Sequence, residues 1–285
     1  MSFPVAVSLL AGVTAIVCLL PGVILVLRRQ SMLTDAIAHS VLPGIVIAAM
    51  LTGTVDSPLL LVGATIAGVV VVAGTQWLRD TGMLAGDSAI GLVFPPLFAI
   101  GVILLTANFR SSHLSEHSVL VGDLNLAAFD RLIVGGYDLG PSYMYTLLAV
   151  GLFTGIVLAV LRRPLSAITF DPAFAKVTGV KMALINQVIM LLVSLTVVAA
   201  FHVAGSILVV ALMIVPPATG LLLSRTVAGV IAVSAVVAVA GSQLGFWLAF
   251  SINAPTSAMM SLVDGALFVI VFAVVRLVRA VRHGS

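Results

Sequence analysis

Long apolar runs separated by short polar intervals account for most of the chain. A helix needs about 20 apolar residues to cross the hydrocarbon core of a bilayer. The sequence contains nine such runs, at roughly 4–27, 33–52, 58–78, 88–107, 143–161, 183–202, 205–223, 227–250 and 258–278. Only His202 to Gly205 separate the sixth run from the seventh, so eight spans also fit the pattern. The pattern predicts an all-α polytopic membrane protein with a single transmembrane domain over residues 1–285.

The composition supports a lipid environment and excludes several classes of function. Hydrophobic residues make up 61% of the chain and charged residues 8%, against roughly 25% charged in an ordinary soluble domain. The single cysteine, Cys18, lies in the first run, so we expect no disulfide, thiolate zinc site or redox motif. The net charge of +3 comes from loop residues and not from a basic patch interleaved with aromatic residues. Membrane lipid is therefore an expected partner and nucleic acid is not.

The basic residues predict how the chain is oriented. Lys and Arg in short loops mark the cytoplasmic side of a membrane protein. Nine spans with the N-terminus outside and the C-terminus inside place the basic clusters in alternate loops. These clusters are Arg28/Arg29, Arg79, Arg162/Arg163 with Lys176 and Lys181, Arg225, and Arg276, Arg279 and Arg282. The same topology predicts an outer loop at about 108–142, which holds Arg110 and Arg131, and a cytoplasmic loop at about 162–182.

Asp35 and His39 lie four residues apart near the start of the second run. Residues at i and i+4 share one face of a helix, so the two side chains should converge. Pro43 cannot donate to the carbonyl of His39, which leaves that oxygen free as well. Ionisable residues inside a membrane are functional candidates by default. The alternative is structural: Asp35 caps the helix start and His39 makes a hydrogen bond between helices.

The functional interpretation of this pair is a transient site for a divalent metal. Carboxylate and imidazole without thiolate suit manganese, iron or zinc better than Cu(I). A structural site normally closes with four ligands, and two are too few. An ion in transit must also be able to leave. Asp35 and His39 are therefore predicted to lie on a translocation path.

Other ionisable residues carry weaker signals. His202 is either a gate ligand or an interfacial histidine, and Asp264 either lines the path or pairs with a neighbouring helix. His113, Glu116 and His117 form an H-x-x-E-H pattern in the outer loop, typical of certain zinc proteases. That loop is too short to form a catalytic domain, so metal collection, partner docking or an ordinary solvated loop remain. The remaining outer acids are candidates for contact with a partner protein; they are Asp123, Asp130 and Asp138.

The interval from about 162 to 182 is the longest polar stretch on the predicted inner face. Asp171 followed by Pro172 is typical of a helix N-cap with proline at the first helical position. A short helix should therefore begin here; the less favoured alternative is a plain linker. No G-x-x-x-x-G-K-[ST] motif occurs in the chain, so it has no phosphate loop of that kind with which to bind ATP.

Three separated stretches resemble one family. RRQSMLTDAIAHSVLPGIVIA (28–48), FDPAFAKVTGV (170–180) and VAGSILVVALMIVPPATGLLL (203–223) are similar, in order, to segments of the integral-membrane permeases of manganese, zinc and iron ABC importers. The resemblance implies a bundle like that of type II ABC importers, in the multi-pass cell membrane of a prokaryote. It also matches Asp171, Ala175 and Gly179 to the element that couples the permease to its ATPase.

The resemblance further implies how such a permease works. It would pair with a cytoplasmic ATP-binding subunit, an extracellular metal-binding protein and a second copy of itself, and would import metal by alternating access. Manganese is the favoured cargo, with zinc or iron as alternatives; no cofactor is permanently bound. The chain would be a transport subunit and not an enzyme, because its partner hydrolyses ATP. The competing hypothesis is a stand-alone secondary transporter or channel that uses Asp35 and His39 as a proton relay.

Overall fold

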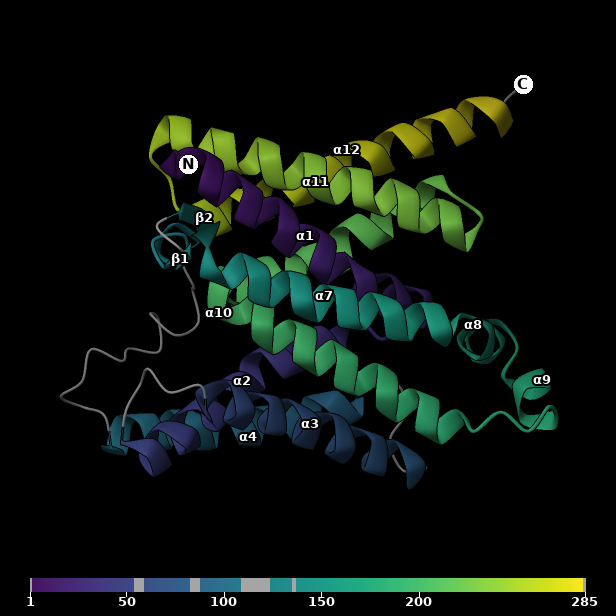
Figure 1. Ribbon diagram of the computed structural model, residues 1–285. Coiled ribbons are helices and arrows are strands. Elements are labelled where there is room, and N and C mark those ends of the chain that lie inside the picture. Colours follow the sequence, from purple (N-terminus) through teal and green to yellow (C-terminus); the bar gives the residue numbers. More distant parts are fainter. Residues whose placement is uncertain (1, 54–58, 83–87, 109–123, 135–136, 284–285) are drawn as a thin grey trace.

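The computed structural model describes residues 2–53, 59–82, 88–108, 124–134 and 137–283, most of which are helical (Figure 1). The helices are α1 (Phe3–Leu27), α2 (Met32–Thr52), α3 (Leu59–Asp80), α4 (Ser88–Asn108), α6 (Leu124–Ala127), α7 (Ser142–Val160), α8 (Arg162–Phe170), α9 (Pro172–Val177), α10 (Met182–Leu223), α11 (Val227–Ile252) and α12 (Thr256–His283). Among the described residues, eight helices are long and apolar enough to cross a membrane. The prediction of an all-α multi-pass protein is confirmed.

A break at Gly205 divides the long helix α10 into two helices. Its 42 residues would extend about 63 Å as one helix, roughly twice the thickness of a hydrocarbon core. Gly205 has φ 76° and ψ 169°, a non-helical conformation that separates two helices. Figure 1 shows the chain entering α10 beside α9 and reversing before it continues into α11. The predicted division at His202 to Gly205 is therefore present.

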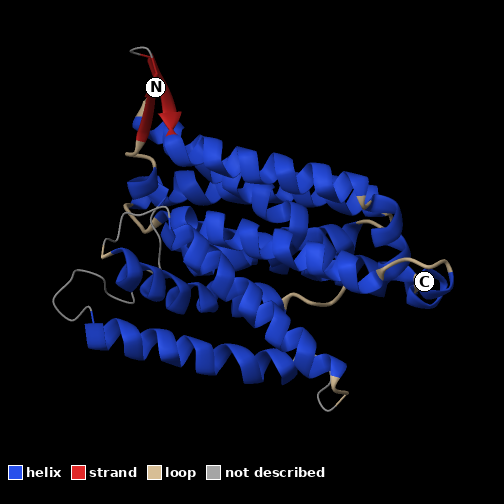
Figure 2. Ribbon diagram, turned by 60° about the horizontal axis from the view of Figure 1, so that its bottom comes forward, coloured by secondary structure: helices blue, strands red, loops and turns tan. Residues whose placement is uncertain are grey.

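The two ends of the bundle carry different elements. The N-terminus lies beside the strands β1 (Arg131–Val134) and β2 (Tyr137–Pro141), and Figure 2 shows these strands projecting from that end. Helices α8 and α9 and the C-terminal end of α12 lie at the opposite end (Figure 1). The basic segments predicted to share one side of the membrane, at 162–182 and 276–282, are thus brought to the same end.

Helix α10 is central to the packing. It contacts α1, α2, α3, α7, α11 and α12, and together with α1 it contributes a large share of the buried apolar side chains. Helices α2, α3 and α4 pack on one another along one side of this core (Figure 1). Close approach of α2 and α3 depends on Gly44 and Gly63, because a Cβ on either would overlap the backbone of the other helix.

The hairpin was not predicted from the sequence. β1 and β2 pair antiparallel inside the stretch expected to be an outer loop, and the short α6 precedes them. Asp138 accepts from the backbone N–H of Gly140 at 3.0 Å and forms an ion pair with Arg131 across the hairpin. Asp130 accepts from the hydroxyl of Ser142 at 2.6 Å. These outer acids therefore have partners within the chain.

Candidate metal site on α2

Asp35 and His39 come together on α2 as the sequence predicts. The Nε2 atom of His39 lies 3.4 Å from Oδ1 of Asp35. The side chains remain 33% and 42% exposed, respectively, so both groups can be reached from outside this single chain. The helix begins after Ser31 at the N-cap position, and Asp35 lies within the first turn. Asp35 is therefore not the capping residue that the structural alternative required.

Helix α4 supplies the surroundings of His39. The imidazole ring lies 6.0 Å from the ring of Phe94 in a stacked arrangement and 5.6 Å from that of Phe98, edge to face. Gly101, also on α4, packs directly against Pro43 on α2. Sequence reasoning missed the two phenylalanines. Their spacing of four residues puts them on one face, but nothing in the sequence indicates that this face meets α2.

This arrangement offers two metal ligands and a space beside them. No group of three or more His, Cys, Asp or Glu side chains forms a metal site within the described ranges. One carboxylate and one imidazole suit a divalent transition metal, but alone they leave most of its coordination positions open. The pair can hold an ion briefly, or hold it more firmly if further ligands come from a facing molecule.

His202 does not join this pair. Its Nε2 atom lies 2.9 Å from the hydroxyl of Tyr143 on α7, and the two rings are 5.0 Å apart. Tyr143 was another residue that the sequence did not single out. A tyrosine partner at the start of α7 fits the interfacial interpretation of His202. The assignment of His202 as a metal ligand stays a prediction.

Asp264 is buried between α11 and α12. Its side chain has no solvent exposure and packs against Gly241 of α11, where an added Cβ would overlap it. Neither carboxyl oxygen has a hydrogen-bond partner within the part of the chain that the structure describes. The two helices therefore meet around Asp264, and it lies outside any cluster of metal-binding groups among the described residues.

The predicted short helix near residue 171 is present. Oδ1 of Asp171 accepts from the backbone N–H of Phe174 at 2.9 Å and so caps α9. Ala175 is fully buried, and Gly179 turns the chain after α9 with φ 73°. Three apolar side chains of this turn are exposed: Phe170, Phe174 and Val177, at 60%, 57% and 89%. The His113, Glu116 and His117 pattern, like Asp123, lies outside the described residues.

The fold defines a class of protein: a polytopic α-helical membrane protein, here with an Asp–His pair on one of its membrane-spanning helices. A family model described as "ABC 3 transport family" matches residues 2–275. The chain belongs to this family and is an ABC transporter permease, a transport component of the membrane.

Individual relatives are similar to the chain over most of its length. The chain is 40% identical over 266 residues to the zinc transport system membrane protein TroD of Treponema pallidum, covering 93% of this chain and 72% of the relative. It is 35% identical over 268 residues to the manganese transport system membrane protein MntD of Bacillus subtilis, covering 94% and 90%. A solved structure of PsaBC from Streptococcus pneumoniae in complex with a Fab superposes with a TM-score of 0.77 at 25% identity, covering 95% and 91%.

Proposed function

We propose that this chain is the permease subunit of an ATP-driven importer of divalent transition metals, with manganese as the favoured cargo and zinc or iron as alternatives. The observation that carries the proposal is the half-exposed Asp35–His39 pair on α2. A carboxylate and an imidazole are ligands for these metals, and the relatives named above are zinc and manganese transport proteins.

The pair would hold the ion only during transport. An isolated pair cannot complete the coordination shell of a metal, so an ion bound by one chain would leave easily. A second copy of the permease would add a second carboxylate and imidazole when the two exposed faces of α2 approach each other. Alternating access would then bring these ligands together to accept the ion and separate them to release it.

Energy would come from a separate ATP-binding subunit. The exposed apolar side chains around α9, Phe170, Phe174 and Val177, suit burial in a groove of a partner protein. Asp171, Ala175 and Gly179 would keep this turn in shape for docking. Such a subunit acts in the cytoplasm, so the end of the bundle with α8, α9 and the C-terminus would face inward. The N-terminus would face outward, where a metal-binding protein would deliver the ion.

The deciding experiment is uptake of radiolabelled manganese and zinc into proteoliposomes. The vesicles would contain this chain, its candidate ATP-binding subunit and the metal-binding protein, with the ATP-binding subunit omitted as control. Uptake that requires ATP hydrolysis is expected, and the two isotopes would rank the metals. Uptake that continues without the ATPase and follows a proton gradient would instead support a secondary transporter.

A further inference from the structure

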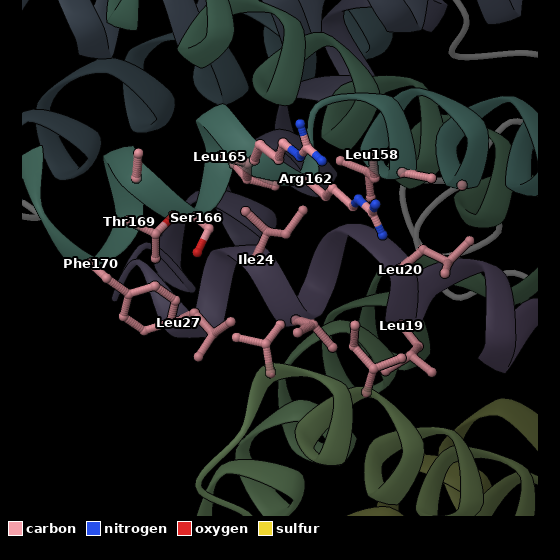
Figure 3. A pocket seen from close by; sticks show the side chains of 17 residues that line it. Leu19, Leu20, Ile24, Leu27, Leu158, Arg162, Leu165, Ser166, Thr169 and Phe170 are labelled. Atoms are coloured by element: carbon pink, nitrogen blue, oxygen red, sulfur yellow. The ribbon is translucent and has the colours of Figure 1, made fainter. Parts of the chain in front are cut away.

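A large apolar cavity lies on a different part of the molecule from Asp35 and His39. It is lined by α1, α7, α8 and the start of α11 and has a volume of about 800 Å³ (Figure 3). Its described lining residues include none from α2, α3 or α4. Sites that hold small organic ligands commonly measure ~300–1,000 Å³. The cavity is therefore large enough for a ligand, and the proposed metal path does not use it.

The lining of the cavity includes two cationic side chains. Leu19, Ile24 and Leu158 are among the aliphatic side chains on its walls, whereas Arg162 and Arg163 line it where α7 gives way to α8. Figure 3 shows Arg162 and the hydroxyl-bearing side chain of Ser166 beside these aliphatic groups. No acidic residue is among its described lining residues. The surface is thus amphipathic, with apolar walls and two cationic groups.

Arg162 and Arg163 lack anionic partners among the described residues. Neither Arg162 nor Arg163 has a hydrogen bond or an ion pair with any described residue. They also form the first turn of α8, which contains no acidic residue. The N-terminus of a helix carries partial positive charge, so cations there raise the local positive potential instead of offsetting it. The part of the cavity beside Arg162 and Arg163 therefore favours a negatively charged group.

We propose that the cavity binds an anionic phospholipid from the surrounding membrane. An acyl chain would lie between α1, α7 and α11, and the phosphate would contact Arg162 and Arg163. The position fits, because the arginines follow directly on the end of the membrane-spanning α7 at Val160, where lipid headgroups meet a span. Basic pockets between membrane helices at the cytoplasmic side are known to hold anionic headgroups.

A phospholipid suits the cavity better than other occupants. A free phosphate would satisfy the arginines but leave the apolar walls unfilled. A second copy of the chain is expected to cover the exposed face of α2, and none of the described lining residues belongs to that helix. The inference goes beyond the proposed transport function, and lipid binding can succeed or fail whether or not the chain moves metal.

Native mass spectrometry of the full permease with its ATP-binding subunit would test this. The probes are dioleoylphosphatidylglycerol and dioleoylphosphatidylcholine, which share acyl chains and differ in charge. The wild type should retain dioleoylphosphatidylglycerol, the anionic lipid, in preference to dioleoylphosphatidylcholine. The double variant Arg162→Gln/Arg163→Gln should weaken that binding by roughly tenfold or more. The control Arg276→Gln/Arg279→Gln removes two arginines near the C-terminal end of α12 and should retain wild-type preference.

A second pair of variants tests the acyl-chain part of the site. Ala159 lines the cavity, so Ala159→Phe should fill it and displace the lipid. Ala149→Phe on the same helix replaces an exposed residue that is not among the lining residues, and it should have no effect. Melting temperatures of all variants would show that each has folded.

Three results would overturn the proposal. The first is equal lipid preference in the Arg162→Gln/Arg163→Gln variant and its control. The second is competition by inorganic phosphate or dihexanoylphosphatidylglycerol as effective as by the long-chain lipid, which would mean a headgroup site alone. The third is loss of permease self-association in Ala159→Phe without loss of bound lipid, which would assign the cavity to contact between copies.

Discussion

Gly101 of α4 packs directly against the ring of Pro43 in α2. A Cβ added at Gly101 would lie 2.8 Å from Cδ and 2.8 Å from N of Pro43, closer than real Cβ contacts allow. This contact holds Phe94 and Phe98 of α4 beside the imidazole of His39. The geometry around the proposed metal ligands therefore depends on Gly101, which has no side chain and follows Phe98 by three residues on α4.

Gly101→Ala should separate α4 from α2. Overpacking of this kind costs about 1–3 kcal/mol, so the thermal unfolding midpoint in detergent should fall and metal uptake should decrease. Gly91→Ala is the matched control, because Gly91 lies on the same helix and has nothing within 4 Å of an added Cβ. Alanine favours a helix over glycine by about 0.5–1 kcal/mol, so the control should be unchanged or more stable. Equal midpoints for the two variants would contradict this packing argument.

Asp35→Ala and His39→Ala should each reduce metal uptake to background. Each change removes one of the two ligands on α2, while the assembled complex should remain in the membrane. Uptake of radiolabelled metal, with co-purification of the ATP-binding subunit as a check on assembly, would measure both effects. Ser40→Ala is the control, because the Ser40 hydroxyl donates to the carbonyl of Ile37 on its own helix, at 2.8 Å, and to no other described residue. Normal uptake in both test variants would remove the site but not the family assignment.

Asp171→Ala should weaken coupling to the ATP-binding subunit. The substitution removes the N-cap that the carboxylate gives to Phe174, a loss worth typically about 1 kcal/mol, and the six-residue α9 should fray. Asp171→Asn keeps a side-chain oxygen that caps nearly as well and should restore coupling. Co-purification of the ATP-binding subunit and ATP-driven uptake would report the effect. If the alanine variant couples like wild type, the cap has no part in docking.

Local features of this fold could be predicted from the sequence, and contacts between distant segments could not. The run at 33–52 became α2 at Met32–Thr52, because a segment that crosses lipid must satisfy its backbone hydrogen bonds within the protein, and a helix does so. The Asp35–His39 approach and the Asp171 cap also follow from helix geometry alone. Phe94 and Phe98 reach His39 only through the packing of α4 on α2. The cavity at Arg162 likewise needs four helices placed together, and no periodicity in the sequence encodes their placement.

Gly205→Ala should destabilise the break inside α10. Gly205 has φ 76° and ψ 169°, a combination that is essentially restricted to glycine, and forcing another residue into it costs about 1–3 kcal/mol. The thermal midpoint should fall accordingly. Gly265→Ala in α12, where an added Cβ meets nothing within 4 Å, should not lower it. A Gly205→Ala variant as stable as wild type would show that α10 reverses direction without needing this conformation.

The β1–β2 hairpin should lose stability in acid through Asp138. The backbone N–H of Gly140 and the Arg131 guanidinium hold the pKa of the Asp138 carboxyl below its usual range. A lowered folded-state pKa means that the ionised group favours the hairpin above the ordinary value of about 3.9. That contribution is lost as the pH falls through the lower folded value. Carbon-13 NMR of labelled aspartate should therefore give a titration midpoint for Asp138 below about 3.9.

Substitution of the neighbouring cation separates the two causes. Arg131→Gln should raise the Asp138 pKa only part of the way to its ordinary value, because the Gly140 N–H, 3.0 Å from Oδ1, would still favour the charged carboxylate. Asp138→Asn should remove the part of the acid dependence that comes from residue 138, since the amide has no charge to lose in this range. A midpoint that returns fully to about 3.9 in Arg131→Gln would mean that the ion pair, and not the backbone N–H, controls this carboxylate.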